Sequence, residues 1–446
     1  MTDSDATRRT PAPGSSTVSA GWRPNPRRIL WPFLLTLVVV AGTWTPPGEL
    51  RDAATRDPVV GMRLVYSDVH IWFAPWFDLL DTLSILTLPQ HWAVLGSVIL
   101  AHAVARTWRV RRRGVRWRTG RELLLAAASI GGLLLVYATA LLVPRPMARL
   151  VVFDPDVLVL DVHGHTTPAH DGRSGFTPWW QRRWLERAGF HAAYLTDHLS
   201  GETRDSLFRR QREAMAQNPP TAGRGVVLLP GAELRAKGQP VTMLSMSAAD
   251  TGWVVDGDRL AGPAVRRADG HPPVLVHKLP SDLSQVAGPA DPAAPPVTAL
   301  EMANGDPRGL AQALREHDRL VRVADSLDLA LVSSSSHHGW GSTAAAWTLM
   351  RLPGWHRQSP ESLAASIEAT LRTKRRLATR VVERRTPELQ AGPQLLVLVP
   401  LMLYELNATL SPSQRLSWIC WIWALFHFGP LVVAWFRGRR VLRSAS

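Results

Sequence analysis

The chain has 446 residues and a formal net charge of +15 at pH 7, and its length exceeds what one ordinary hydrophobic core holds. Much of the positive charge stands in short runs beside apolar stretches, such as "RRIL", "RTWRVRRRGVRWRTGR" and "RGRRVLR". This placement is typical of membrane-flanking segments and argues against direct nucleic-acid binding. The single cysteine, Cys420, excludes a disulfide within the chain.

Three apolar runs in the first third of the chain predict membrane-spanning helices, since roughly 17 residues is the shortest length that crosses a bilayer. We expect a basic cytoplasmic tail at residues 1–28, a first span at 29–45 and an extracytoplasmic loop at 46–83. A second span at 84–106, an Arg-rich cytoplasmic loop at 107–121 and a third span at 122–144 follow. The Arg-rich loop holds no acidic residue, and short basic loops stay on the cytoplasmic side. Twelve of the 19 tryptophans lie before residue 120 or after residue 415, where such rings anchor at the interface.

The central segment changes pattern at about residue 150. Short apolar runs predict strands and amphipathic stretches predict helices, the strands at 157–163, 192–198, 225–233, 241–247, 273–279, 298–304 and 329–336 and the helices at 177–189, 203–217 and 306–326. Continuous apolar strands that alternate with helices indicate a parallel sheet buried on both faces, either open or closed into a barrel. The Gly-rich stretch "GWGSTAAAWTLM" predicts a turn leading into a helix at Ser342 or Thr343.

Polar residues follow the ends of these strands. They are Asp161, His163 and His165, then Asp197 and His198, Glu233, His277, Glu301 and Asn304, and finally Ser336, His337 and His338. The carboxyl ends of parallel strands form one rim, where active sites gather. So many imidazoles and carboxylates on one rim would destabilise each other without a cation, and this donor set suits zinc, iron or manganese. For the His-x-His pair alone, hydrogen-bonded core histidines are the competing interpretation.

The C-terminal part holds two apolar segments, residues 394–410 and 416–436, before a basic tail at 437–446. If both crossed the membrane, the basic tail would lie outside the cytoplasm, against the usual charge bias. We therefore expect only the second segment to cross, with the first at the interface or packed on other helices. These features together predict an integral protein of a bacterial-type inner or plasma membrane, with its central domain, residues 150–390, outside the cytoplasm.

The motifs "DVHGHTTPAHDG", "GFHAAYLTDH", "LLPGAEL", "VLVHKLP" and "SSSSHHGWG" resemble, in this order, those of the PHP (polymerase and histidinol phosphatase) family. The resemblance covers about residues 155–342. It implies a distorted (β/α)7-type barrel that carries one to three divalent transition metals (Zn, Mn or Fe) and hydrolyses phosphoesters. It also implies that His163 and His165 hold one metal, that Glu233 bridges to a second supported by His277, and that a third is held by His198, His338 and either His170 or Asp171.

Two positions depart from the family pattern. Ser336 stands where the family has a metal-binding aspartate, and Thr242 stands where it has a further histidine. His337 could replace one of these ligands by a small shift in register, and Glu301 could approach from the next strand. Otherwise the site holds fewer metals, or the domain is a catalytically degenerate module that binds or senses a ligand.

The resemblance predicts a membrane-anchored hydrolase that attacks a phosphoester with a metal-activated water. Glu233 and Asp197 are the expected catalytic residues, and Asp197 would orient an imidazole. Alternatively, Asp197 caps the N-terminus of a helix beside Ser200 and Thr203. Cations near the expected ligands are candidates for binding the phosphate of a small-molecule or polymeric substrate, although solvated surface residues explain them equally well. They are Arg173, Arg235 and Lys278.

Overall fold

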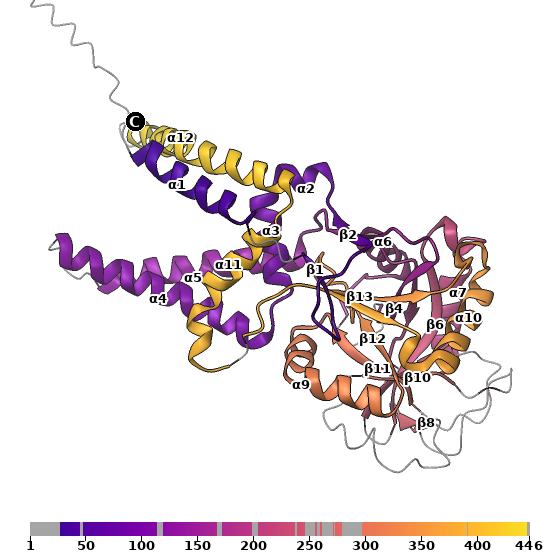
Figure 1. The fold of residues 1–446 in the computed structure, drawn as a ribbon. Helices are drawn as coiled ribbons and strands as arrows, with labels where there is room; N and C mark the ends of the chain where they lie inside the picture. Colours follow the sequence, from indigo (N-terminus) through magenta and orange to yellow (C-terminus); the bar gives the residue numbers. More distant parts are fainter. Residues whose placement is uncertain are drawn as a thin grey trace, which may run out of the picture. The chain divides into compact units, whose positions relative to one another are not determined.

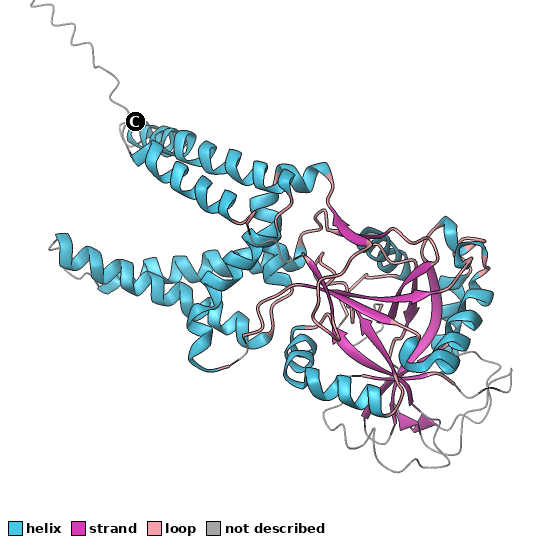
Figure 2. Cartoon of the chain, in the orientation of Figure 1, coloured by secondary structure: helices cyan, strands magenta, loops and turns pink. Residues whose placement is uncertain are grey.

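The computed structural model describes residues 27–44, 48–113, 119–166, 172–198, 204–236, 239–245, 255–256, 259–260, 271, 273–278, 297–389 and 391–443 (Figures 1 and 2). The chain forms two compact units, which are Met1–Val38 with Ile419–Ser446 and Val39–Trp418. Residues 1–26 of the predicted N-terminal tail and 114–118 of the predicted Arg-rich loop lie outside the described residues. The rest of that loop is helical, and residues 437–443 of the predicted C-terminal tail form the end of the last helix.

The smaller unit holds most of α1 (Arg27–Ala41) and of the long helix α12 (Pro412–Arg443). The Trp423 indole Nε1 donates to Thr36 Oγ1 at 3.0 Å, which joins the two helices. Apolar side chains of α1 are widely exposed, Val38 by 59%, so the described part of the chain leaves much of their surface uncovered. The apolar stretch of α1, Ile29–Ala41, is four residues shorter than the predicted first span, 29–45.

Two helices of the larger unit, α4 (Leu88–Arg113) and α5 (Thr119–Leu142), are long and apolar enough to cross a membrane. Only 11% and 6% of their most apolar windows are covered by the rest of the chain. The core helix of a soluble protein would be mostly covered, whereas these two helices are mostly uncovered by the described part of the chain. Arg106 Nε lies 2.6 Å from Glu122 Oε2 and ties the two helices together at the arginine-rich end. The C-terminal segment predicted at 394–410 contains a shorter helix, α11 (Leu398–Thr409).

The larger unit is built on one curled mixed sheet of order β1-β14-β13-β4-β5-β6-β7-β10-β11-β12 (Figures 1 and 2). Its strands are β1 (Leu50–Asp52), β14 (Arg380–Arg384), β13 (Ala346–Arg351), β4 (Val157–Gly164), β5 (Ala192–Leu195), β6 (Val227–Ala236), β7 (Gln239–Leu244), β10 (Leu275–His277), β11 (Val297–Asn304) and β12 (Ala330–Ser334). Two short strands, β8 (Val255–Asp256) and β9 (Arg259–Leu260), join it beside β6.

All seven predicted strands are confirmed, but the expectation of a wholly parallel sheet is wrong. β4, β5 and β6 are parallel, as are β10, β11 and β12, whereas β7 is antiparallel to both β6 and β10. Only two residues separate β6 from β7, too few for the crossover that a parallel pair requires. The sheet curls enough for the Ser333 backbone N–H of β12 to donate to Thr348 Oγ1 of β13 at 2.8 Å.

The predicted helix at Ser342 or Thr343 is also wrong. The chain there enters β13, which pairs antiparallel with β4 on one side and β14 on the other. The run "AWTLM" contains Trp347, which is fully buried, and its indole donates to Ala188 O at 3.0 Å. Burial between two strands thus outweighs the helical propensity of the preceding alanines.

The three predicted helices are confirmed as α6 (Pro178–Ala188), α7 (Arg204–Met215) and α9 (Pro307–Ser326), and α10 (Pro360–Lys374) joins them. α9 begins where the Asp306 side chain accepts from the Gly309 N–H at 3.3 Å. α6 ends at Gly189, whose φ of 91° favours glycine and where a Cβ would lie 2.3 Å from Leu150 O. The loop predicted at 46–83 contains α2 (Asp68–Trp72), α3 (Ala74–Ser84), the edge strand β1 and β2 (Met62–Val65), which pairs with β3 (Arg149–Val152).

Candidate metal centre

The strands β4, β5, β6 and β12 bring five of the predicted ligands to one place. His163 lies at the end of β4 and His165 directly follows it. His198 follows β5 and forms an isolated bridge with Glu233 on β6. His338 follows β12 by four residues. The rim predicted from the ends of parallel strands is therefore present for these residues.

The first ligand group is His163, His165 and Glu233, all buried. His163 Nε2 lies 2.7 Å from His165 Nε2 and 2.9 Å from Glu233 Oε2, and His165 Nε2 lies 3.3 Å from the same carboxylate oxygen. One ion at roughly 2.0–2.1 Å from each atom can reach all three. These atoms are the donors that zinc, iron and manganese prefer.

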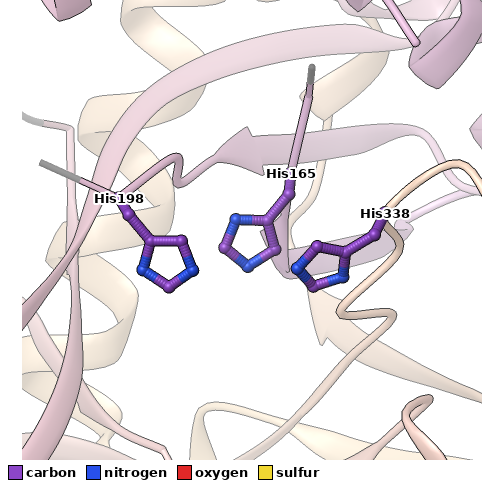
Figure 3. A group of neighbouring side chains, drawn as sticks. All are labelled: His165, His198 and His338. Atoms are coloured by element: carbon purple, nitrogen blue, oxygen red, sulfur yellow. The ribbon is translucent and has the colours of Figure 1, made fainter. Parts of the chain in front are cut away.

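The second ligand group is His165, His198 and His338, whose rings stand side by side (Figure 3). The His165 ring stacks on His338 with centroids 4.2 Å apart and on His198 with centroids 4.8 Å apart. Because His165 belongs to both groups, the two candidate ion positions adjoin. Oxygen and nitrogen donors from four segments of the chain thus converge on one small volume.

In the first group, the pKa shifts of His165 and Glu233 favour cation binding, whereas the pKa of His163 is raised, because burial and Lys278 are outweighed by Glu233 and Glu301. Burial lowers the pKa of His165 well below its ordinary value, and the proximity of His163 and His338 lowers it further. Burial acts to raise the pKa of Glu233, but His163, His165 and Lys278 outweigh it and hold that pKa well below its usual range. A neutral imidazole beside an ionised carboxylate is the protonation state that a metal requires.

The Nδ1 atoms of His163 and His165, which face away from the shared Nε2 contact, have few neighbours that could form hydrogen bonds. His163 Nδ1 and His165 Nδ1 are buried and accept or donate no hydrogen bond among the described residues. Glu301 Oε1 lies 3.8 Å from His163 Nδ1, and this oxygen also accepts from Asn304 Nδ2 at 2.8 Å. Glu301, which the sequence suggests as a further ligand, therefore lies beside Nδ1 of His163, whereas the other members of the group lie beside Nε2. The residues fit a metal through their Nε2 atoms.

Two buried aspartates hold the segments that carry the ligands. Asp161 accepts from the Ser335 N–H at 2.9 Å and from Ser335 Oγ at 2.6 Å, and burial raises its pKa to about 6. Asp197 accepts from the N–H and the hydroxyl of Thr166, each at 2.6 Å. Asp197 therefore positions the residue next to His165, and its two carboxylate oxygens bind Thr166 instead of an imidazole. Ser200 and Thr203, which its alternative capping role would involve, lie outside the described residues.

Lys278, predicted to bind substrate, lies on the carboxylate of Glu233. Its Nζ is 3.0 Å from Oε1 and 3.2 Å from Oε2. The ammonium therefore stands where a second cation bridged by Glu233 would be expected. Lys278 also lines a cavity of about 440 Å³ together with His198, His338 and Arg308, which we call the cluster cavity.

Two predicted ligands lie outside both groups. His277 is buried near Glu301, and burial lowers its pKa. His337 contacts residues outside both groups: its Nδ1 lies 3.1 Å from Gln181 Oε1, and its ring stacks on Trp184 with centroids 4.0 Å apart. Burial lowers the pKa of His337 to about 3, so the ring is neutral. His337 therefore does not replace the missing aspartate.

Of the remaining predicted site residues, some are described by the structure and others are not. Arg173 is described and lines a second cavity next to the site. His170, Asp171 and the side chain of Arg235 lie outside the described residues. Thr242 and Ser336, which occupy the two departing positions, are buried, and Thr242 lies directly opposite Glu233 in the β6–β7 register.

Sequence reasoning missed Thr166 and Ser335, which hold the two aspartates, and Arg308, which lines the cluster cavity. Arg308 is the second residue of α9, directly after Asn304–Asp306 at the end of β11. Its position after a strand end that carries Glu301 and Asn304 is a signal that could have indicated it. Thr166 and Ser335 carry no such signal, because their partners are far away in the sequence.

No family model matches the chain, and no curated protein matches it. Among solved structures, the chain is similar to the crystal structure of PsfC from Pseudomonas syringae PB-5123, with 17% identity and a TM-score of 0.33. That match covers 57% of this chain and 99% of the other. A TM-score this low assigns neither a fold family nor an activity.

Proposed function

We propose that this chain is a membrane-anchored, metal-dependent hydrolase that acts on phosphoesters. The observation that supports it is the convergence of His163, His165 and Glu233 beside His198 and His338, and the last two line the cluster cavity. Buried imidazole and carboxylate donors within reach of one ion are costly to assemble without a cation. Their order along the chain also matches the motifs on which the resemblance to the PHP family rests.

His163, His165 and Glu233 would hold one ion, and His198 and His338 would hold a second that shares His165. A bound ion of this kind supplies a Lewis acid and an acidified water at neutral pH. Asp161 and Asp197 keep the ligand-bearing segments in register through Ser335 and Thr166. Arg308 and Lys278 line the same cavity and provide positive charge for a phosphoryl group.

The membrane anchor is part of the proposal. α4 and α5 have the length and the apolar composition to span a bilayer, and α5 runs directly into the domain that carries the cluster. The Gly341 N–H, three residues after His338, donates to Leu141 O near the end of α5 at 2.9 Å. The site would therefore lie close to the membrane surface on the side where α5 exits.

A second candidate function is a binding or sensing module without turnover. The contact of Lys278 with both oxygens of Glu233 favours it, because an ammonium in that place competes with a second metal. Thr242 and Ser336 at two ligand positions point the same way. Such a module would bind a phosphorylated ligand and, supplied with metal, would still not cleave it.

The test is made on the full-length protein purified in detergent. We expect bound transition metal and metal-dependent cleavage of p-nitrophenyl phosphate or its bis-ester in the wild type, and loss of both in His163→Ala/His165→Ala. The matched control, His317→Ala/His356→Ala, removes two imidazoles that lie outside both ligand groups. Equal metal content in the wild type and the cluster variant would refute the proposal. Metal bound without any cleavage would favour the binding module.

A further inference from the structure

A second cavity, of about 290 Å³, lies at the end of the apolar helix α5. One part of its lining is Leu141, Leu142 and Val143, which are 46%, 47% and 50% exposed. We call it the arginine cavity, because Arg173, Arg183 and Arg187 also line it. Exposed apolar side chains at the end of a helix of membrane-spanning length suit a ligand with an apolar chain.

The charge of the arginine cavity comes mainly from one face of α6. Trp180, Arg183, Trp184 and Arg187 recur at helical spacing and all line the cavity, and Arg173 adds a third guanidinium. No carboxylate lines the cavity, and within the described ranges none lies in ion-pair distance of these three arginines. Guanidinium groups gathered without counter-charges favour a bound anion, above all a phosphate.

Exposed tryptophans surround these arginines. Trp179 and Trp180 are 47% and 48% exposed, and their rings contact edge to face at 4.6 Å. The Arg183 guanidinium lies 5.4 Å from the Trp179 ring centroid, and that of Arg173 lies 5.9 Å from the ring of Trp340. Exposed tryptophan and arginine side by side are typical of protein surfaces at the lipid headgroup layer.

The arginine cavity adjoins the cluster cavity. The two share Leu141, Trp184, His337 and Gly341 in their linings. The Arg173 N–H donates to His338 O at 2.8 Å, so an arginine of one cavity is tied to a candidate metal ligand of the other. A ligand held by its apolar chain at α5 can thus present its headgroup to the histidine cluster.

We infer that the substrate is a membrane lipid that carries a phosphomonoester, an inference that rests on the proposed hydrolytic function. Its apolar chain lies along Leu141–Val143 and Trp180, and its phosphate lies at the histidine cluster, on the side where Arg173, Arg183 and Arg187 provide positive charge. Water attacks phosphorus, the bond from phosphorus to the lipid oxygen breaks, and that oxygen takes up a proton. The products are the lipid alcohol, which stays in the bilayer, and inorganic phosphate.

The experiment compares a lipid with its soluble headgroup, using the full-length protein in mixed micelles. We expect kcat/KM for phosphatidic acid to exceed that for glycerol 3-phosphate by about 100-fold or more, because only the lipid buries an apolar chain. Arg183→Gln/Arg187→Gln should lower the value for phosphatidic acid by about tenfold or more. Arg315→Gln/Arg322→Gln, which removes the same charge from the exposed face of α9, should leave it unchanged.

A binding measurement separates this inference from the proposed function. Native mass spectrometry should show phosphatidic acid retained by the wild type and the α9 control, retained less by the α6 variant, and phosphatidylcholine not retained. Lipid retention of this kind without any turnover would refute the hydrolase and support the lipid site. Cleavage of glycerol 3-phosphate as fast as phosphatidic acid, or an α6 variant that behaves like the control, would overturn the lipid site alone.

Discussion

Single residues in this protein have roles that depend on which side of the chain faces the site. His337 and His338 are neighbours, yet His338 stacks on His165 while His337 stacks on Trp184. Asp161 and His163 lie two apart on β4, yet Asp161 binds Ser335 and His163 reaches Glu233. The residue types of a candidate metal site can be recognised in the sequence, but the division between candidate ligands and supporting residues requires the fold.

His191 is a titratable residue outside both candidate ligand groups, and its burial links folding stability to pH. The Val159 N–H donates to His191 Nδ1 at 3.0 Å, the ring stacks on Trp355 at 4.4 Å, and burial lowers the pKa of His191 to about 4. The unfolded chain takes up this proton near pH 6.5, so it binds more protons than the folded chain between pH 6.5 and 4. Folding stability therefore falls as the pH drops through this window, by up to roughly 3 kcal/mol from this residue.

The prediction is checked with His191→Asn, whose side-chain oxygen can still accept from the Val159 N–H but does not titrate. The thermal midpoint in detergent should fall less between pH 7 and pH 4.5 in this variant than in the wild type. All other titrating groups are common to both proteins and cancel in the comparison. An equal fall in the two proteins would show that His191 is protonated in the folded state.

At the scale of elements, the sequence predicts the helices and strands that depend on local residue patterns. The seven strands and three helices of the central domain follow from apolar periodicity. Hydropathy predicts α4 and α5, although α4 begins four residues and ends seven residues after the predicted span. Pairing partners were not predictable in this way. β1 joins β14 across more than 300 residues, β13 forms where the sequence predicts a helix from Ser342 or Thr343, and Asp161 meets Ser335 across 174 positions. Only tertiary contacts determine such pairs.

The buried carboxylate of Asp81 on α3 links the segment after α5, the loop that follows His338 and β14. It accepts from Arg145 Nη2 at 2.9 Å just after α5, from Thr343 Oγ1 at 2.9 Å, and from Arg384 Nη1 of β14 at 3.3 Å. Asp81→Asn would leave the buried Arg145 without its carboxylate, and we expect a loss of about 3–5 kcal/mol in the free energy of unfolding.

The matched control for this change is Asp325→Asn, which breaks the exposed ion pair with Arg376 and should cost about 1 kcal/mol or less. Thermal unfolding in detergent at pH 7 compares the two variants with the wild type. A midpoint for Asp81→Asn no lower than that of Asp325→Asn would mean that water or another group replaces the lost charge.

For the molecule as a whole, bound metal would link the strands of the central sheet, because its ligands come from β4, β6 and the segments after β4, β5 and β12. A ligand that binds only the folded state raises stability, by about 2.7 kcal/mol when present at 100 times its dissociation constant. Removing metal with a chelator should therefore lower the thermal midpoint of the wild type by several degrees, and added Zn²⁺ or Mn²⁺ should restore it. His163→Ala/His165→Ala, which lacks two of the ligands, should not respond to either treatment. A chelator effect of the same size in the variant and the wild type would place the stabilising ion elsewhere in the protein.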